Sequence, residues 1–146
     1  MKLTTKGRYA VTTLLDLALS EHDGPITITE VAKRHGISPA YLERLAGIMR
    51  AKGLLKSIRG PHGGYLLARH AKDITVADIM LAVDEKIDTT RCKGRANCQE
   101  GEMCSTHHLW EQLNHKIFHF LQGVTLSDLV ATPQLLGQPV IRFEHA

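Results

Sequence analysis

The stretch ISPAYLERLAGIMRAKGLLKSIRGPHGGYLLA, residues 37–68, carries the pattern that decides the fold. Ser38 is a good helix N-cap, and Pro39 is well placed at the first helical position. The helix that they begin is predicted to run to about Lys52, because Gly53 is a typical left-handed residue at a helix C-terminus. Its apolar residues fall on one face at helical spacing: Leu42, Leu45, Ala46 and Met49.

The segments on either side make this helix part of a winged helix-turn-helix. A shorter helix is predicted from about Thr29 to His35 and ends at Gly36, so that two helices are joined by a turn. Two short strand candidates follow, at 54–58 and 65–68, with the turn sequence RGPHGG between them. Two helices followed by a β-hairpin with a basic tip predict a winged helix within a mainly α fold.

Further helices are predicted before and after this unit. The first runs from Thr4 or Thr5 to about Glu21. Another begins at Thr75, where Thr75-Val76-Ala77-Asp78 resembles a capping box, and continues to about Asp84.

Beyond the winged helix, the pattern changes to a loop and a long helix. Residues 85–103 lack apolar periodicity and predict a loop, whereas a long helix is predicted from near Cys104 to about Gln122. A last short helix is predicted to begin at Thr125 or Ser127. The long helix carries an apolar stripe that a second copy of the chain can bury, which predicts a dimerisation helix. This stripe consists of Trp110, Leu113, Ile117, Phe120 and Leu121.

Charge is distributed unevenly along the chain. Residues 1–72 hold 12 Lys/Arg against 5 Asp/Glu, a net +7, whereas residues 73–146 hold 6 against 10, a net −4. A basic N-terminal half favours a polyanionic partner, most simply double-stranded DNA, although an ordinary solvated surface gives the same totals. No apolar run is long enough for a membrane span. Asp16 interrupts the apolar part of the N-terminal segment, and three cysteines do not form a secreted disulfide framework, so we expect a cytoplasmic protein.

Candidate base-contacting residues lie at the start of the second helix of the helix-turn-helix, because this part of such a helix reaches base edges. They are Ser38, Ala40, Tyr41, Glu43 and Arg44. Arg44 suits guanine and Glu43 suits a cytosine amino group. Because a carboxylate repels phosphates, Glu43 favours selection between sites over affinity. A pairing of Glu43 with Arg44 or Lys33 on a solvated face is the open alternative.

Basic residues of the wing and of the first helix are candidates for the DNA backbone and minor groove. Arg59, between the strands, fits a narrow minor groove, and Lys56 and His62 fit phosphates. Three more basic residues stand near the N-terminus: Lys2, Lys6 and Arg8. For Lys2, simple solvation is the better interpretation.

All three cysteines fall in one pattern, Cys92-x5-Cys98-x5-Cys104-x2-His107. Zinc knuckles pair their ligands as C-x2–4-C, so two five-residue gaps fit a loop around a larger object. Cys104 and His107 are predicted to project from one face of a helix start. A set of three cysteines and one histidine suits a 2Fe–2S cluster, in which histidine can replace cysteine. Zinc is also allowed, and His108 is a rival to His107.

Several stretches resemble one group of bacterial regulators. They are MKLTTKGRYAV (1–11), ISPAYLERL (37–45), SIRGPHGGYLL (57–67), AVDE (82–85) and TRC-x5-C-x5-C-x2-H-x2-W (90–110). Together they are similar to the IscR-type iron–sulfur cluster regulators, a winged-helix family that also includes the NsrR nitric oxide sensors. The resemblance covers roughly residues 1–130. It does not extend to the tail, and His108 departs from the pattern.

The resemblance implies a homodimeric repressor and activator that binds a 2Fe–2S cluster and controls iron–sulfur cluster assembly genes. It also implies cluster ligands at Cys92, Cys98, Cys104 and His107, base contacts at Ser38, Tyr41, Glu43 and Arg44, and a minor-groove arginine at Arg59. A nitric oxide or redox sensing repressor of the same fold is the alternative.

We therefore predict four parts. They are a winged helix-turn-helix DNA-binding domain (1–84), a cluster-binding loop (85–104), a dimerisation helix with a following short helix (104–132) and a tail (133–146). The sequence offers no paired carboxylates, no nucleophile with a base and no phosphate-binding glycine loop, so we expect neither an enzyme nor a small-molecule substrate. The basic helix-turn-helix with its wing disfavours an electron carrier or a zinc-binding interaction module.

Overall fold

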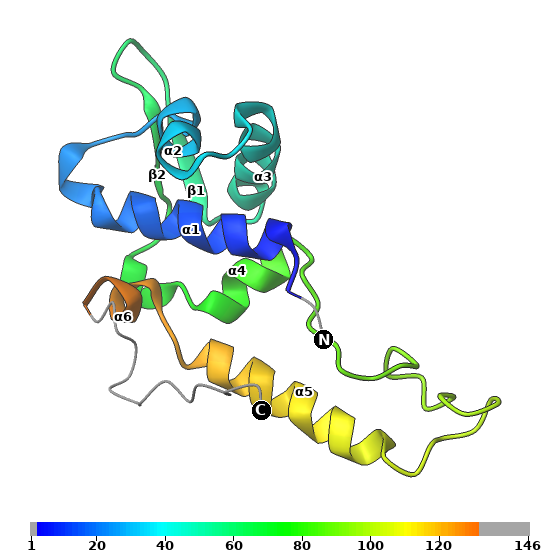
Figure 1. Cartoon of the computed structure of the whole chain (residues 1–146). Helices are drawn as coiled ribbons and strands as arrows, with labels where there is room; N and C mark the ends of the chain where they lie inside the picture. The colour runs from blue at the N-terminus through cyan, green and yellow to red at the C-terminus, as the bar shows by residue number, and fades with distance from the viewer. Residues whose placement is uncertain (1–2, 132–146) are drawn as a thin grey trace, which may run out of the picture.

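A computed structural model of the chain describes residues 3–131. Figure 1 shows helix α1 crossing the middle of the molecule, with a helix pair and a hairpin on one side and α4 and α6 on the other. The elements are α1 (Thr5–Leu19), η1 (Glu21–Asp23), α2 (Ile28–His35), α3 (Pro39–Ala51), β1 (Leu55–Ile58), β2 (Gly64–Leu67), η2 (Ala71–Asp73), α4 (Val76–Ala82), α5 (His107–Gln122) and α6 (Leu126–Ala131). The predicted mainly α, winged helix-turn-helix fold is confirmed.

Helix α3 has the boundaries that its sequence predicts, to within one residue. The Ser38 hydroxyl accepts a hydrogen bond from the Tyr41 N–H at 3.4 Å, and Pro39 occupies the first turn. The helix ends at Ala51, and Gly53 has a φ of 79°, which a glycine adopts without strain. Its inward face buries the four predicted residues: Leu42, Leu45, Ala46 and Met49.

The wing is a two-stranded antiparallel hairpin in which Leu55 pairs with Leu67 and Ile58 pairs with Gly64. Gly64 permits a close backbone approach at the base of this hairpin. Its φ is 152°, and a Cβ at this position would lie 2.5 Å from the backbone of Ile26. Ile26 and Tyr65 exchange two backbone hydrogen bonds there, so the segment before α2 is tied to the wing.

One hydrophobic core joins the helices of the body. Its largest fully buried side chains come from α1, α2, α3, α4 and α6 and include Leu14, Ile28, Leu42, Met49, Ile79 and Leu126. Each contributes about 1.5–3 kcal/mol relative to an exposed side chain. Helix α5 buries none of its apolar residues fully, because its one buried residue is His107.

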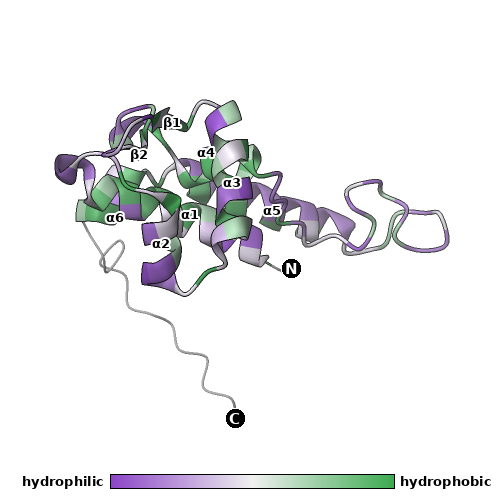
Figure 2. Cartoon of the chain, turned by 90° about the horizontal axis from the view of Figure 1, so that it is seen from above, coloured by the Kyte–Doolittle hydropathy of each residue, from purple (hydrophilic) through white to green (hydrophobic). Residues whose placement is uncertain are grey.

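Helix α5 and the loop before it project from this body, as Figures 1 and 2 show from two directions. Residues 83–106 contain no helix or strand, which agrees with the predicted loop. The prediction that the long helix begins near Cys104 was wrong by three residues, since α5 begins at His107. The Cys104 N–H donates to Cys98 Sγ at 3.0 Å, which holds Cys104 in the loop.

The remaining predicted starts agree with the structure. Thr75 and Asp78 form a reciprocal capping box at the start of α4, with both hydrogen bonds at 3.0 Å. Thr125 and Asp128 form the same pair of bonds before α6. Lys2 and the predicted tail, 133–146, lie outside the described residues. Within residues 3–131, the structure has no helix whose length and apolar character would let it cross a bilayer.

Candidate metal centre and nucleic-acid interface

The loop and the start of α5 bring three predicted ligands together. His107 Nδ1 lies 3.5 Å from Cys92 Sγ and 3.8 Å from Cys98 Sγ. The three ligand atoms all lie within 4.8 Å of one another, a spacing that one metal site can span. The residues come from separate parts of the fold, two from the loop and one from the first turn of α5.

Cys104 lies beside this group and is not a member of it. Its N–H donates to Cys98 Sγ at 3.0 Å, and its own sulfur lies 3.7 Å from Thr106 Oγ1. Cys104, Cys98 and His107 line one cavity of about 210 Å³, which Trp110 also borders. The expectation that Cys104 and His107 project from one face of a helix was wrong, because Cys104 precedes α5.

His107 and His108 occupy different environments. His107 is 3% exposed and lies against the two sulfurs. The His108 side chain is 73% exposed, and its Nδ1 lies 3.6 Å from Glu111 Oε2. The two neighbours diverge because successive residues of a helix point about 100° apart. Of the two histidines, the structure therefore places His107 at the candidate metal centre.

The local backbone and the neighbouring thiols shift the cysteine pKa values. Burial raises the pKa of the Cys92 thiol, but the backbone N–H groups of Ala96 and Asn97 outweigh this effect and lower the pKa to about 7. The hydrogen bond between the Cys98 and Cys104 side chains raises the pKa of Cys98 and lowers that of Cys104. Because the thiolate is the metal-binding form, the lowered pKa values of Cys92 and Cys104 favour metal binding near neutral pH.

A polar clamp joins the start of the loop to α5. The Asn114 side chain donates to Asp88 Oδ1 at 2.9 Å and accepts from the Thr89 N–H at 2.8 Å. The Thr89 hydroxyl also donates to the Trp110 backbone oxygen at 2.8 Å. The Asp88 carboxylate accepts from the hydroxyl and the N–H of Thr90, and these bonds lower the pKa of Asp88.

The sequence patterns did not predict this clamp. Asp88, Thr89 and Thr90 form a local turn in which the Asp88 carboxylate accepts from the N–H of Thr90, two residues later. Aspartate often forms such turns, so this part of the clamp could have been predicted from the sequence. Asn114 is 26 residues from Asp88, and its sequence position on a polar part of α5 gives no signal.

The candidate base-contacting residues lie together at the start of α3. Ser38, Ala40, Glu43 and Arg44 are exposed, whereas Tyr41 is half-buried. The Tyr41 ring meets the ring of Tyr9 edge-on, with centroids 5.9 Å apart. Among the ion pairs of residues 3–131, none involves Glu43 or Arg44, so the suggested pairing of Glu43 with Arg44 or Lys33 does not form.

The wing presents its basic residues to solvent. Arg59 follows β1 directly, at the start of the turn, and is exposed together with His62. Lys56 is exposed on β1, where it pairs with Leu66 of β2. The tip is closed by a hydrogen bond of 3.0 Å from the Gly63 N–H to the Gly60 oxygen.

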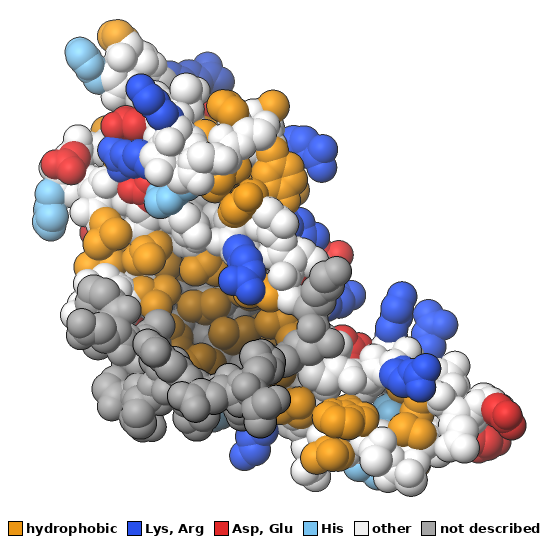
Figure 3. Space-filling model, in the orientation of Figure 1, with side chains coloured by type: hydrophobic (Ala, Val, Ile, Leu, Met, Phe, Trp, Pro, Cys, Tyr) orange, Lys and Arg blue, Asp and Glu red, His pale blue; other side chains and the backbone are white. Residues whose placement is uncertain are grey.

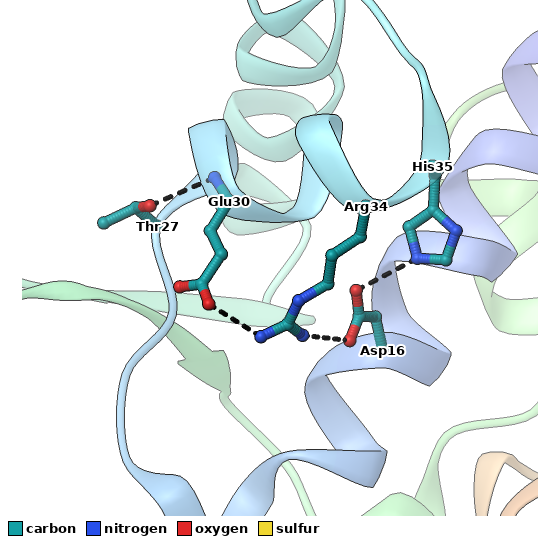
Figure 4. A network of polar contacts seen from close by, with 5 residues as sticks. All are labelled: Asp16, Thr27, Glu30, Arg34 and His35. Atoms are coloured by element: carbon teal, nitrogen blue, oxygen red, sulfur yellow. Dashed lines mark hydrogen bonds and ion pairs between the residues drawn. The ribbon is translucent and has the colours of Figure 1, made fainter.

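Two other basic residues of the helix-turn-helix have a structural role instead (Figure 4). Asp16 of α1 accepts from Arg34 Nη1 at 2.7 Å and lies 3.0 Å from His35 Nε2, so α2 is fixed to α1. Arg34 also donates to Glu30 at 2.8 Å, and the Glu30 N–H donates to Thr27 Oγ1 at 3.2 Å. Arg34 and His35 are thereby separated from the candidate DNA contacts. Nothing in the sequence around Asp16 predicts its contacts with Arg34 and His35.

Comparisons with known sequences agree on one family. The profile of the Rrf2 family, described as an iron-dependent transcriptional regulator, matches residues 3–132. The HTH-type transcriptional regulator IscR of Photorhabdus laumondii subsp. laumondii is 48% identical over 136 residues, which cover 93% of this chain and 83% of that protein. The protein of the same name from Klebsiella pneumoniae (strain 342) is 47% identical over 145 residues, with 99% and 89% covered.

Comparisons with solved structures give the same result. The T. potens IscR structure matches with a TM-score of 0.75 at 34% identity, covering 94% of this chain and 93% of that one. The structure of CymR, the global cysteine regulator of B. subtilis, matches with a TM-score of 0.77 at 33% identity, covering 90% and 97%. The similarity extends through the winged helix and the segment that carries the cysteines.

Proposed function

The chain belongs to the Rrf2 family of DNA-binding transcriptional regulators, and on this premise we propose that it senses iron–sulfur cluster status through a bound 2Fe–2S cluster and controls iron–sulfur cluster assembly genes. The predicted resemblance to the IscR-type regulators is confirmed, and the chain is a regulator, not an enzyme. Cluster sensing, the cluster type and the target genes are parts of the proposal.

One observation carries the proposal: the convergence of Cys92 Sγ, Cys98 Sγ and His107 Nδ1 within 4.8 Å. Cys104, which borders the same cavity as Cys98 and His107, supplies the fourth ligand. Its place outside the compact group of three favours a site for two metal ions over a single tetrahedral ion, because two irons spread their four ligands further apart. These donors fit a 2Fe–2S cluster. When bound, it would supply iron bonds that join the loop covalently to α5.

The residues of the chain determine how such a site responds. An imidazole ligand must be neutral, so a proton competes with the metal for His107 more readily than in a site of four cysteines. His107 itself is held in place by its position in the first turn of α5 and by its burial. We therefore assign to His107 the role of the ligand that makes the cluster easier to lose.

DNA recognition is assigned to the start of α3 and to the wing. Ser38, Ala40, Tyr41, Glu43 and Arg44 are placed in the major groove, where a helix of this kind contacts base edges. Arg59 is placed in the minor groove and Lys56 on the backbone. Since Glu43 has no ion-pair partner in residues 3–131, its carboxylate is free to discriminate between operators.

We assign homodimerisation to the surface of α5. Leu109, Trp110, Leu113, Phe118 and Phe120 are all at least 36% exposed, which is unusual for large apolar side chains along one helix. Figure 3 shows apolar side chains gathered in a hollow of the molecule. One apolar cavity is lined by residues of α1, α4, α5 and α6, including Val11, Val76, Met80, Phe120 and Leu129. A second copy of the chain has the apolar helix that this surface requires.

Anaerobic purification tests the proposal. The protein is expected to be coloured, with two irons and two sulfides per chain by chemical analysis, as a 2Fe–2S centre requires. Replacement of Cys92, Cys98, Cys104 or His107 by Ala should abolish or weaken the colour, whereas His108→Ala should not. Colourless protein that contains one zinc per chain would overturn cluster binding while leaving the family and DNA binding intact.

A further inference from the structure

Glu85 lies at the boundary between the winged helix and the cysteine loop. The residue is only 6% exposed although no Lys or Arg side chain pairs with its carboxylate among residues 3–131. Oε1 accepts from the Thr4 N–H at 2.7 Å, and Oε2 accepts from the Thr4 hydroxyl. A buried carboxylate of this kind needs a specific role, because burying a charge without a cationic partner is unfavourable.

The contact caps helix α1 from a distant part of the chain. Thr4 is the N-cap of α1, and its side chain makes no capping hydrogen bond to the helix. In a capping box, an acidic side chain within the helix accepts from the N-cap N–H. Here Glu85, 81 residues further along, takes that position. Its negative charge is also favourable at the N-terminus of a helix.

Gly7 allows this approach. A Cβ at Gly7 would lie 2.8 Å from Glu85 Cγ and 3.0 Å from Met80 Sδ, too close for either to remain in place. Glycine is a poor residue for the interior of a helix compared with alanine. Its presence in the first turn of α1 is therefore explained by the close packing of Glu85 against the helix.

The same end of α1 contacts the start of the recognition helix α3. The Tyr9 ring meets the Tyr41 ring at 5.9 Å and an interplanar angle of 78°. Thr5 and Tyr9 border one surface depression together with Ser38 and Tyr41. Since Ser38 and Tyr41 are assigned to base contacts, a displacement of the first turns of α1 reaches the residues that face DNA.

The chain beyond Glu85 is fixed to the candidate metal centre. Asp88, three residues later, binds Asn114 on α5, and Cys92 lies four residues after Asp88. Residues 85–90 thus form a bridging segment, with one end bonded to the start of α1 and the other to the helix that carries His107.

We propose that Glu85 is a positioning residue that couples occupancy of the Cys/His site to the recognition helix α3 through the first turns of α1. The proposal rests on the proposed cluster function. Formation of the metal site fixes the loop. The fixed loop restrains the bridging segment and, with it, the position of Glu85. Glu85 in turn holds the start of α1 against Tyr41. Loss of the cluster leaves the bridging segment held to α5 by the contacts of Asp88 and Thr89 alone, which loosens the cap.

Hydrogen–deuterium exchange of the full chain tests the coupling. The wild type is compared after reconstitution with iron and sulfide and after removal of the metal by a chelator. Cluster loading is expected to slow exchange in the first turns of α1 and α3 on the order of tenfold, the size of a typical coupling between sites. Glu85→Ala and Gly7→Ala should reduce this difference to less than about twofold while the visible spectrum and the cluster lifetime stay those of the wild type.

Asp84→Asn is the matched control, because it removes a neighbouring negative charge that is exposed and does not contact Thr4. It should behave as the wild type does. Gly7→Ala adds a better helix residue, so loss of coupling in this variant does not come from a lower helix propensity of α1. Equal exchange in the loaded and metal-free wild type, or an undiminished difference in both variants, would overturn the coupling alone. A wild type that takes up no iron would overturn the cluster function and the coupling together.

Discussion

Asn114 Nδ2 donates a hydrogen bond of 2.9 Å to Asp88 Oδ1, and this contact joins the two halves of the candidate metal centre. Asp88 lies four residues before Cys92, and Asn114 lies seven residues after His107. The loop and the helix are therefore held together by protein contacts that do not involve a metal. Ligands that are already positioned lose less conformational freedom on binding, so the clamp should increase affinity for the metal.

Asn114→Ala is expected to shorten the lifetime of the cluster. The change removes the hydrogen bonds to Asp88 and Thr89, each of which contributes about 0.5–1.5 kcal/mol. The rate of cluster loss in air, followed by visible absorbance, should rise roughly tenfold, since about 1.4 kcal/mol corresponds to that factor. The neighbouring Gln112→Ala changes an exposed residue of the same helix and should leave the rate unchanged. Equal lifetimes in the two variants would show that the clamp does not position the ligands.

Local patterns predicted the winged helix well. The Ser38–Pro39 start, the Thr75–Asp78 capping box and the glycine-rich turn of the wing each depend on residues within a few positions of one another. Such local interactions are visible in the sequence. The start of α5 was misplaced because Cys104 bonds to Cys98, and this contact depends on how the loop folds.

The residue types of the candidate site could be predicted from the sequence, but the contacts that hold its loop and helix in place could not. The spacing of Cys92, Cys98, Cys104 and His107 predicted the candidate donors. The structure brings Cys92, Cys98 and His107 together and separates His107 from His108 by burial. The contacts of Asn114 and of Glu85 join residues 25 or more positions apart, and neither residue belongs to a local motif. Tertiary contacts of this kind leave no periodicity or spacing to detect.

His107→Cys is expected to give a more persistent cluster and stronger cluster-dependent regulation. A cysteine thiolate replaces a neutral imidazole, which removes the ligand that a proton displaces most readily in mildly acidic solution. The lifetime of the visible absorbance should lengthen. His108→Ala serves as the control, since His108 is exposed and faces Glu111. The idea fails if the wild type and His107→Cys lose their clusters at the same rate.

Cys92 should titrate near neutral pH in reduced, metal-free protein. Its pKa is lowered to about 7, below the ~8.5 of an unfolded thiol, so the folded state binds fewer protons between these values. This contribution to stability is fully present above pH ~8.5 and is lost as the pH falls through about 7. Thiolate absorbance in the ultraviolet should rise around pH 7, and Cys92→Ser should remove that step. His108→Ala should retain it, because His108 is exposed and is not among the groups that lower the pKa of Cys92.

Glu43→Ala is expected to relax the choice of operator more than it weakens binding. The carboxylate is exposed on α3, and removing it removes repulsion from phosphates as well as a contact to a cytosine amino group. Two duplexes are first selected from a random pool, one by cluster-loaded wild type and the other by cluster-free wild type. Dissociation constants of the variant and the wild type should then be measured for both duplexes. Their ratio should move toward one, with affinity for the weaker duplex rising. Equal weakening at both duplexes would assign Glu43 to affinity instead of selection.

Arg59→Ala is expected to weaken DNA binding in a manner that depends on the sequence next to the major-groove site. Arg59 is exposed at the start of the wing turn, and the minor groove of A·T-rich DNA concentrates negative potential. If the guanidinium enters this groove, its loss should cost about 1–3 kcal/mol at a duplex with an A·T-rich flank and less at a G·C-rich flank. The slope of log K against log salt should also fall by about one. Lys72→Ala removes an exposed charge of η2 and should change neither the flank preference nor the slope. A loss that is the same at both flanks would place Arg59 on the phosphate backbone.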